Sequence, residues 1–217
     1  MNGILGFVIL EEKMEKDYHD YVINDGKLIG NFDEMYKECE NPWHQREDAA
    51  ISYSRWDTVR TIKNYGIKNV LECGCGLGFF TKLMADLLPE SKITGMDVSP
   101  NAIRRAKEMF PHIHFYAGNV NDLGKERKID NYDCIIFSEI MWYILEDLKE
   151  IFKNIRDNFN GYIIVNQTFY NGQQKYGNNF FTNEQEMANF LCLNSLVLNI
   201  YKKRDVDSYA THNVFKI

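Results

Sequence analysis

A glycine-rich stretch and two acidic side chains form the pattern in this sequence that best suits ligand chemistry. In VLECGCGLG, an apolar run leads directly into Gly74, Gly76 and Gly78, with Glu72 two positions ahead of the first glycine. Glycine lets the chain turn sharply and lets a ligand approach the backbone without a Cβ in the way. Asp97 closes the next apolar run, in ITGMDVSP. A carboxylate there is suited to accept hydrogen bonds from both hydroxyls of a ribose, so the pattern predicts a nucleoside-containing ligand.

The glycine spacing separates two classes of such ligands. A dinucleotide fold needs Gly-x-Gly-x-x-Gly with a small residue next to the helix, and Phe79 breaks that fingerprint. The observed Gly-x-Gly-x-Gly, preceded by Glu72, resembles motif I of the class I S-adenosylmethionine-dependent methyltransferases. The resemblance implies S-adenosyl-L-methionine as cofactor and S-adenosyl-L-homocysteine as product, with Glu72 near the cationic methionine end and Asp97 on the ribose. The alternative for Asp97 is an acid that caps the following helix or lies in a loop.

A third motif of that family follows the third expected strand, in FYAGNVNDL. Family members often carry Gly-Asp there, with the acid near the adenine amino group, whereas this sequence has Gly118 and Asn119. Because an amide still accepts through its carbonyl oxygen, the resemblance implies Asn119 at the adenine, with Asp122 as the alternative. The cofactor site implied in this way consists of Glu72, Gly74, Cys75, Gly76, Gly78, Asp97, Val98, Asn119, Val120, Ser138, Arg55 and Trp43.

The segment SEIMWYIL, at the end of the fourth expected strand, is where an acceptor should bind, because open α/β sheets react beyond the carboxyl ends of their strands. The Asp/Asn-Pro-Pro-Tyr/Phe motif of nucleic-acid amino methyltransferases is absent there. Glu139, Trp142 and Tyr143 instead resemble a pattern of the nodulation-type N-methyltransferases, which act on sugar-derived amines. The resemblance implies Glu139 as base or acceptor-orienting group, supported by Tyr143. The alternatives are a solvated or helix-capping acid for Glu139 and a core residue for Trp142.

The polar, aromatic-rich N-terminal part adds further candidates. Nodulation-type enzymes carry Pro-Trp near the start of the helix that covers the cofactor, and Pro42 and Trp43 in NPWH resemble it. His44, held in such a lid, is a second candidate base, with a plain surface histidine as the alternative. Arg55 is a candidate partner for the cofactor carboxylate, and a surface ion pair explains it equally well.

The elements that must position these residues follow from the alternation of apolar runs and helical patterns, which is typical of βαβ units. The expected strands are 69–73, 92–97, 112–116, 132–137, 162–166, 196–201 and 211–216, and the expected helices are 79–88, 100–110, 145–159 and 183–191. They predict an α/β fold with a doubly wound, seven-stranded, mostly parallel, Rossmann-like sheet. We expect residues 1–66 to form a helical, aromatic cap and residues 67–217 the cofactor-binding core, with loop 168–181 contacting the acceptor.

Bulk composition excludes several classes. The chain has 217 residues with 25 Lys and Arg against 31 Asp and Glu, a net charge of −6, which disfavours non-specific binding to nucleic acids or anionic membranes. Its five cysteines lack zinc-site spacing and predict reduced thiols in a cytoplasmic protein, and no metal-ligand pattern has convincing spacing. The apolar run 4–10 is far shorter than the roughly 20 residues that span a bilayer, so we expect no membrane segment.

Together these features predict an enzyme that transfers a methyl group to a nitrogen or oxygen of a small polar acceptor by in-line displacement. The acceptor expected from the resemblance is a sugar or sugar-phosphate intermediate, as in surface-polysaccharide biosynthesis, and the chain is expected to be a monomer or homodimer. The alternatives are a protein or RNA acceptor, a non-catalytic cofactor-binding module, and a nicotinamide-dependent reductase, against which Phe79 argues.

Overall fold

A computed structural model describes residues 17–24, 26–46, 52–170, 172, 176–202 and 207–217, so the apolar run 4–10 lies outside the described part. The main sheet is built from β3 (Asn69–Cys73), β4 (Lys92–Asp97), β5 (His114–Ala117), β6 (Cys134–Ser138), β7 (Tyr162–Tyr170), β8 (Ser195–Lys202) and β9 (Ser208–Lys216). The helices around it are α3 (Tyr53–Asn64), α4 (Phe79–Leu87), α5 (Pro100–Met109), α6 (Leu148–Asn158) and α7 (Glu184–Phe190).

The strand order is β5-β4-β3-β6-β7-β9-β8, with β9 antiparallel to both of its neighbours and the other pairs parallel. The chain adds β4 and β5 on one side of β3 and then returns to place β6 on the other side of β3. The strand order therefore reverses at β3, which makes the carboxyl end of β3 a topological switch point. The predicted doubly wound, seven-stranded, mostly parallel sheet is confirmed.

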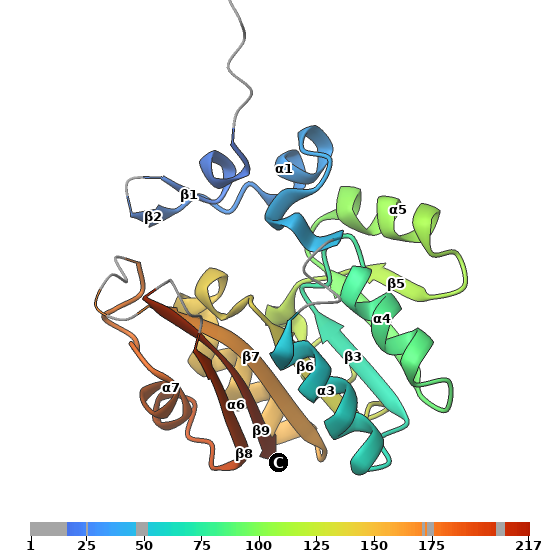
Figure 1. Ribbon diagram of the computed structural model, residues 1–217, viewed down its shortest axis with the longest axis vertical. Helices are drawn as coiled ribbons and strands as arrows, with labels where there is room; N and C mark the ends of the chain where they lie inside the picture. The colour runs from blue at the N-terminus through green and yellow to red at the C-terminus, as the bar shows by residue number, and fades with distance from the viewer. Residues whose placement is uncertain (1–16, 25, 47–51, 171, 173–175, 203–206) are drawn as a thin grey trace, which may run out of the picture.

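Strand side chains alternate between two buried faces because successive residues of a strand point to opposite sides. One face packs against α3 and α4 through Val70, Ile136, Ile164 and Val214. The other face packs against α6 and α7 through Leu71, Ile135, Ile163 and Phe215. Helices therefore cover the sheet on both sides (Figure 1), and the parallel strands all end at the same edge of it.

Local signals set several element boundaries. Gly78, with a φ of 80°, ends the glycine loop and directs the chain into α4. Ser99 caps α5 by accepting a hydrogen bond from the Ala102 N–H at 3.0 Å, and Pro100 occupies the first helical position. The sequence prediction of this cap is confirmed.

Several expected boundaries differ in the structure, among them the starts of the strands expected at 112 and 132, which lie at His114 and Cys134. Strand β7 continues to Tyr170 and β9 begins at Ser208, because these two residues pair at the end of a long antiparallel ladder. The first residues of expected loop 168–181 are therefore strand. The expected helix 145–159 begins instead as a 3-10 turn at Leu145–Asp147, and α6 follows it.

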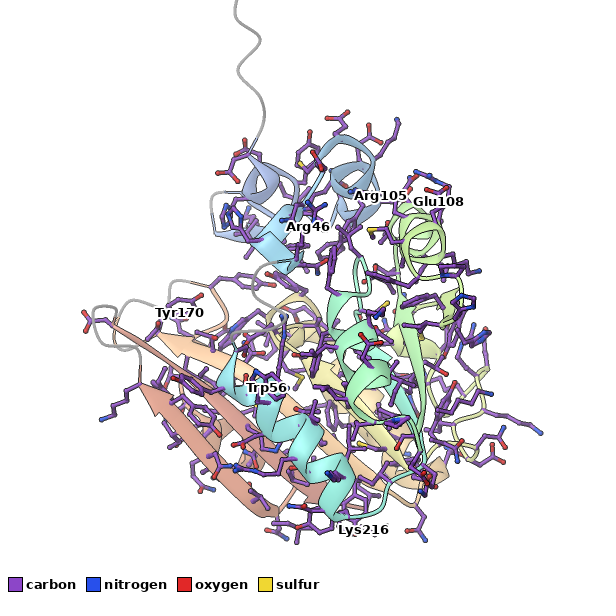
Figure 2. All side chains as sticks on the ribbon, turned by 45° about the vertical axis from the view of Figure 1, so that its right-hand side comes forward. Arg46, Trp56, Arg105, Glu108, Tyr170 and Lys216 are labelled. Carbon is purple, nitrogen blue, oxygen red and sulfur yellow. The ribbon has the colours of Figure 1, made fainter. Side chains whose placement is uncertain are left out.

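An N-terminal segment lies over the carboxyl ends of the parallel strands (Figure 1). It comprises a 3-10 turn (Tyr18–Tyr21), a short hairpin of β1 (Ile23–Asn24) and β2 (Lys27–Leu28), α1 (Phe32–Glu38) and a second 3-10 turn (Pro42–His44). Asp33 accepts hydrogen bonds from Ser99 Oγ at 2.7 Å and the Asn101 N–H at 2.9 Å at the start of α5. Arg105, on α5, donates to the backbone carbonyls of Tyr36 at 2.7 Å and Cys39 at 2.9 Å (Figure 2). Polar contacts therefore attach this segment to α5. Helix α3, within the expected 1–66 cap, instead packs on the sheet.

Candidate cofactor and acceptor site

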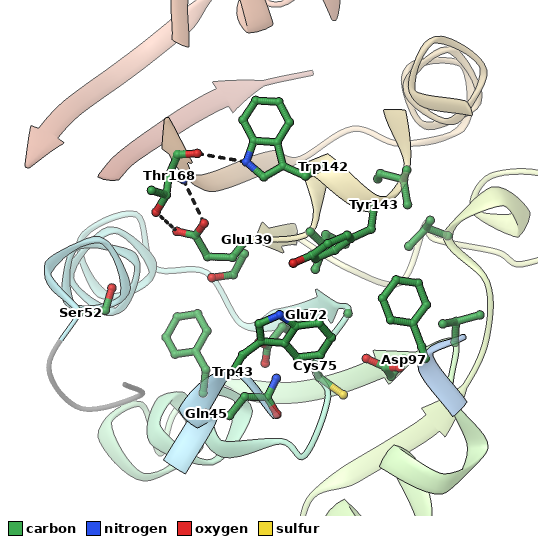
Figure 3. A pocket seen from close by; sticks show the side chains of 18 of the residues that line it. Trp43, Gln45, Ser52, Glu72, Cys75, Asp97, Glu139, Trp142, Tyr143 and Thr168 are labelled. Carbon is green, nitrogen blue, oxygen red and sulfur yellow. Dashed lines mark hydrogen bonds between the residues drawn. The ribbon is translucent and has the colours of Figure 1, made fainter. Parts of the chain in front are cut away.

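A cleft of about 1400 Å³ opens at the carboxyl edge of the sheet, beneath the N-terminal segment. It contains the glycine loop on one side and the ends of β6 and β7 on the other (Figure 3). A cavity of this size exceeds the roughly 300–1000 Å³ of a typical small-molecule site, so it has room for a cofactor and a second small molecule. Of the predicted site residues, all except Gly76 and Gly78 line this cleft.

Asp97 lies at the end of β4 and is almost completely buried. Its carboxylate accepts hydrogen bonds from the Gly76 N–H at 2.8 Å and the Ser99 N–H at 2.9 Å. Burial raises the pKa of Asp97 to about 6, and the two backbone N–H groups oppose that rise. Each oxygen keeps a further lone pair, so this acid braces the loop and still offers acceptor sites to a ligand.

Glu72 is the second buried acid of the cleft, with 3% of its surface exposed. It accepts a hydrogen bond from Thr81 Oγ1, on α4, at 2.5 Å. Burial raises the pKa of Glu72 to about 7, and the Thr81 hydrogen bond and the positive charge of Arg55 both oppose this rise. A carboxylate held in this way is suited to meet a cationic group of a ligand.

Arg55, on α3, lies close enough to Glu72 for its charge to act on that carboxylate. Its guanidinium lies 5.2 Å from the ring centroid of Phe80, a cation–π contact that helps to orient it. The Nη1 atom is buried and has no hydrogen-bond partner in the protein. Buried donors normally have a partner, so Nη1 marks a position at which an anionic ligand group fits.

The opposite end of the cofactor half of the cleft carries the third motif. Asn119 caps a 3-10 turn at Val120–Asp122 by accepting from the Asn121 N–H at 3.0 Å, and Val120 is buried behind it. Val98 is half exposed, which leaves its side chain accessible to a ligand. Ser138, at the end of β6, is buried, and its Oγ atom has no hydrogen-bond partner in the protein.

The glycines of the loop are also required by protein packing. A Cβ on Gly76 would lie 2.3 Å from Gln45 Nε2 and 2.4 Å from the Tyr36 hydroxyl. Gln45 accepts a hydrogen bond from the Leu77 N–H at 2.9 Å and donates to Tyr36 at 3.3 Å. A Cβ on Gly78 would likewise lie 2.7 Å from the ring of Phe115. Sequence reasoning missed Gln45 and Tyr36, which bring the N-terminal segment onto the loop.

The half of the cleft that is expected to bind the acceptor contains Glu139, which follows the last residue of β6. Its φ of 61° is unusual for a residue with a side chain, and strained backbone of this kind concentrates at functional sites. The carboxylate accepts from the Thr168 N–H at 2.9 Å and from Thr168 Oγ1 at 3.1 Å. Trp142 Nε1 donates to the Thr168 carbonyl at 3.0 Å (Figure 3). Glu139 is thus fixed by β7, and Thr168 is a site residue that the sequence did not single out.

Aromatic rings of the N-terminal segment pack against Tyr143, at the side of the cleft where Glu139 lies. The Trp43 ring centroid lies 5.9 Å from that of Tyr143 and 6.3 Å from that of Phe32. Trp43 and His44 have φ angles of 56° and 50°, so the NPWH turn adopts left-handed backbone at two successive residues. The structure therefore brings Trp43, His44 and Tyr143 together on the wall of one cleft.

Comparison with known proteins assigns the family. A family model described as a methyltransferase domain matches residues 66–211, which is more than half of the chain. The chain belongs to this methyltransferase family. Together with the fold, the match confirms the predicted class I S-adenosylmethionine-dependent methyltransferase and its cofactor. Two relatives, a nodulation protein and a solved N-methyltransferase structure, confirm the resemblance to the nodulation-type enzymes.

Individual relatives of this methyltransferase match over part of their length. Nodulation protein S of Sinorhizobium fredii is 28% identical over 129 residues, covering 57% of this chain and 57% of that protein. Malonyl-[acyl-carrier protein] O-methyltransferase 1 of Ilyobacter polytropus is 32% identical over 90 residues, covering 40% of this chain and 32% of that protein. The chain thus spans from about a third to just over half of the length of these curated relatives.

A solved structure shares the fold over most of both chains. The N-methyltransferase NodS of Bradyrhizobium japonicum, in complex with S-adenosyl-L-homocysteine, matches with a TM-score of 0.63 at 17% identity. The match covers 86% of this chain and 98% of that chain. At this identity the likeness concerns the fold alone.

The residues of the cleft fit S-adenosylmethionine. The buried, unpartnered Arg55 Nη1 suits its carboxylate, Glu72 suits its ammonium group, and Asp97 has lone pairs for its ribose.

Among the described residues, no group of three or more His, Cys, Asp and Glu side chains is arranged to hold a metal ion. No helix in the described part of the chain is long and apolar enough to cross a membrane. All five cysteines are free thiols.

Proposed function

We propose that this methyltransferase acts on a nitrogen or oxygen of a small polar molecule, a sugar or sugar-phosphate intermediate such as those of surface-polysaccharide biosynthesis. The observation that carries the proposal is the Glu139 carboxylate, which Thr168 holds with two hydrogen bonds at the acceptor side of the cleft. The cofactor supplies the methyl group, and the chain's own residues bind and orient the acceptor.

Glu139 supports this role because methyl transfer depends mainly on alignment. Holding reacting atoms about 3–3.5 Å apart in line supplies a large part of the rate enhancement, and no nucleophilic side chain is required. A base contributes when the acceptor is a hydroxyl or a protonated amine. Glu139 is the proposed group that takes this proton or orients the acceptor, Tyr143 supports it, and His44 is the second candidate base.

The lining of the acceptor half supports a polar, ring-shaped acceptor. Tyr170 and Tyr176 both line the cleft, with Tyr170 close to Glu139, and the rings of Tyr53 and Tyr201, which also line it, stack with centroids 5.6 Å apart. Aromatic faces and hydroxyl groups together suit a sugar, which presents both apolar C–H faces and hydrogen-bonding groups. The net charge of −6 and the absent Asp/Asn-Pro-Pro-Tyr/Phe motif argue against a nucleic-acid acceptor.

The test is transfer of a labelled methyl group from S-adenosylmethionine to a panel of amino sugars, sugar phosphates and simple amines. Glu139→Gln is expected to lower kcat by roughly 100-fold or more and to leave the Kd for S-adenosylhomocysteine within twofold. Glu146→Gln, an exposed acid on the 3-10 turn ahead of α6, is the matched control and should keep full activity. Full activity of Glu139→Gln removes this residue from the mechanism.

The same panel separates the alternatives. Label transfer to RNA or protein, with none to small molecules, replaces the proposed acceptor class. Tight binding of S-adenosylhomocysteine without transfer to any acceptor indicates a non-catalytic cofactor-binding module.

A further inference from the structure

His212 lies on β9, fully buried between α3 and the sheet, and is not among the residues that line the cleft. Its Nδ1 atom lies 2.9 Å from Asn166 Oδ1, on β7. Its Nε2 atom lies 3.0 Å from Thr61 Oγ1, on α3. A single imidazole therefore connects the helix that carries Arg55 with the strand that holds Glu139.

The hydrogen-bond partners define how this network is protonated. Asn166 Oδ1 only accepts, so His212 Nδ1 carries the proton, and Nε2 accepts from the Thr61 hydroxyl. Thr58 Oγ1 donates to the Ser54 carbonyl at 3.0 Å and accepts from Asn166 Nδ2 at 2.9 Å. Every polar atom of this neutral imidazole is satisfied, and a network satisfied in this way holds its members in one geometry.

Burial favours the same neutral state. It lowers the pKa of His212 to about 4, while Asp57 raises that pKa and Arg60 lowers it. Asp57 and Arg60 both belong to α3 and form an ion pair with each other. His212 therefore acts as an uncharged hydrogen-bonding group at neutral pH.

Both ends of the network continue directly into the cleft. On α3, the carbonyl of Ser54 is held by Thr58, and the next residue, Arg55, carries the guanidinium that faces Glu72. On β7, the Asn166 carbonyl accepts the Glu139 N–H at 2.8 Å. The residue two positions further, Thr168, binds the Glu139 carboxylate.

We propose that His212 is a positioning residue that sets the places of Arg55 and Glu139 relative to one another. This inference rests on the proposed function for the role of Glu139, whereas its Arg55 half concerns cofactor binding alone. Replacing the imidazole by an apolar side chain leaves Asn166 Oδ1 and Thr61 Oγ1 without their partner in a buried interface, which favours a shift of α3 away from β7.

The experiment compares His212→Leu with Val214→Ala. Val214 is equally buried on the same face of β9 and makes only apolar contacts, so its truncation destabilises the fold without touching the network. Calorimetry with S-adenosylhomocysteine, well below the melting midpoint of each variant, should show affinity at least fivefold weaker in His212→Leu and unchanged within twofold in Val214→Ala. With an acceptor from the panel, His212→Leu should raise the KM for S-adenosylmethionine and also lower kcat.

Two additional variants keep the inference testable if His212→Leu does not fold. Thr61→Val removes only the hydroxyl that donates to His212 and should weaken S-adenosylhomocysteine binding in the same direction by a smaller factor. His212→Gln restores an amide donor and acceptor and should recover part of the lost affinity. Equal affinity in a folded His212→Leu and in Val214→Ala overturns the positioning role, as does an unchanged affinity in Thr61→Val. Because calorimetry needs no acceptor, a wrong acceptor class leaves this result interpretable.

Discussion

Glu72 offers a prediction in which stability and cofactor binding change in opposite directions. The pKa of Glu72 in the folded chain is about 7, against 4.5 for an ordinary glutamate. A folded-state pKa above the unfolded value means that the folded chain binds the proton more tightly. The associated stability is present in full below about pH 4.5 and is lost as the pH rises through about 7.

The size of the effect follows from that shift. Each pKa unit corresponds to about 1.4 kcal/mol, so a rise from 4.5 to about 7 makes ionised Glu72 cost about 3 kcal/mol at pH 8. Glu72→Gln removes the charge, keeps the shape and still accepts from Thr81. We expect this variant to be about 3 kcal/mol more stable than the natural chain at pH 8, a rise of roughly 6–12 °C in Tm for a protein of this size. The same variant should bind S-adenosylhomocysteine about 10- to 100-fold more weakly, because it loses a charged hydrogen bond.

Urea denaturation at two pH values is the decisive assay. At pH 5 the natural Glu72 is protonated in the folded chain, so the stability difference should fall below about 1 kcal/mol. Glu126→Gln is the matched control, because Glu126 is exposed and its replacement should change stability by less than about 0.5 kcal/mol at either pH. A difference of the same size at pH 5 and pH 8, or a Glu72→Gln variant less stable than the natural chain at pH 8, refutes the argument from burial.

Three further predictions concern the glycine loop, the contact of Thr168 with Glu139, and Asp97. In urea denaturation, Gly76→Ala should lower the free energy of unfolding more than Gly66→Ala does. Both glycines have a positive φ, at which an added Cβ costs about 1–2 kcal/mol. Only at Gly76 would that Cβ also lie within 3 Å of other side chains. Equal losses would show that the N-terminal segment does not press on the loop. Thr168→Val removes one of the hydrogen bonds to Glu139 and keeps the backbone one, so kcat should fall about tenfold with an unchanged Kd for S-adenosylhomocysteine. Because the pKa values of Glu72 and Asp97 are about 7 and about 6, calorimetry should show S-adenosylhomocysteine affinity falling below pH 7 and falling more steeply below pH 6, and a profile that is no steeper below pH 6 than above it contradicts the ribose-binding role of Asp97.

Local patterns predicted much of the fold. The buried strands are short apolar runs, and the helix after Ser99 begins with a cap and a proline, so these elements depend on neighbours within a few residues. The extra length of β7 and β9 was missed, because the pairing of Tyr170 with Ser208 joins residues far apart in the chain. The polar composition of residues 168–181 predicted an irregular loop. Its first residues are strand only because β7 pairs with β9 there.

In the candidate site, too, residues fixed by local spacing were predictable and residues placed by long-range packing were not. Sequence spacing alone was enough to predict the glycine loop, Glu72 and Asp97 as cofactor-site candidates, because strand, loop and helix follow one another and their spacing is local. It left Arg55 open between a cofactor partner and a surface ion pair, and the packing of α3 placed its Nη1 atom in a buried position. It indicated Glu139 as a candidate, but only the adjacency of β6 and β7 supplied Thr168 as its partner.

The side chains that support these groups come from segments distant in the chain, and only long-range packing brings them into place. Gln45 reaches the glycine loop from the N-terminal segment, and His212 joins α3 to β7 from the last strand. Neither residue stands in a motif, since a hydrogen bond between distant segments leaves no periodicity or spacing in the sequence. The chain order of this methyltransferase thus specifies its cofactor loop, and the long-range packing of the sheet and its helices specifies how that loop and the acceptor side are held.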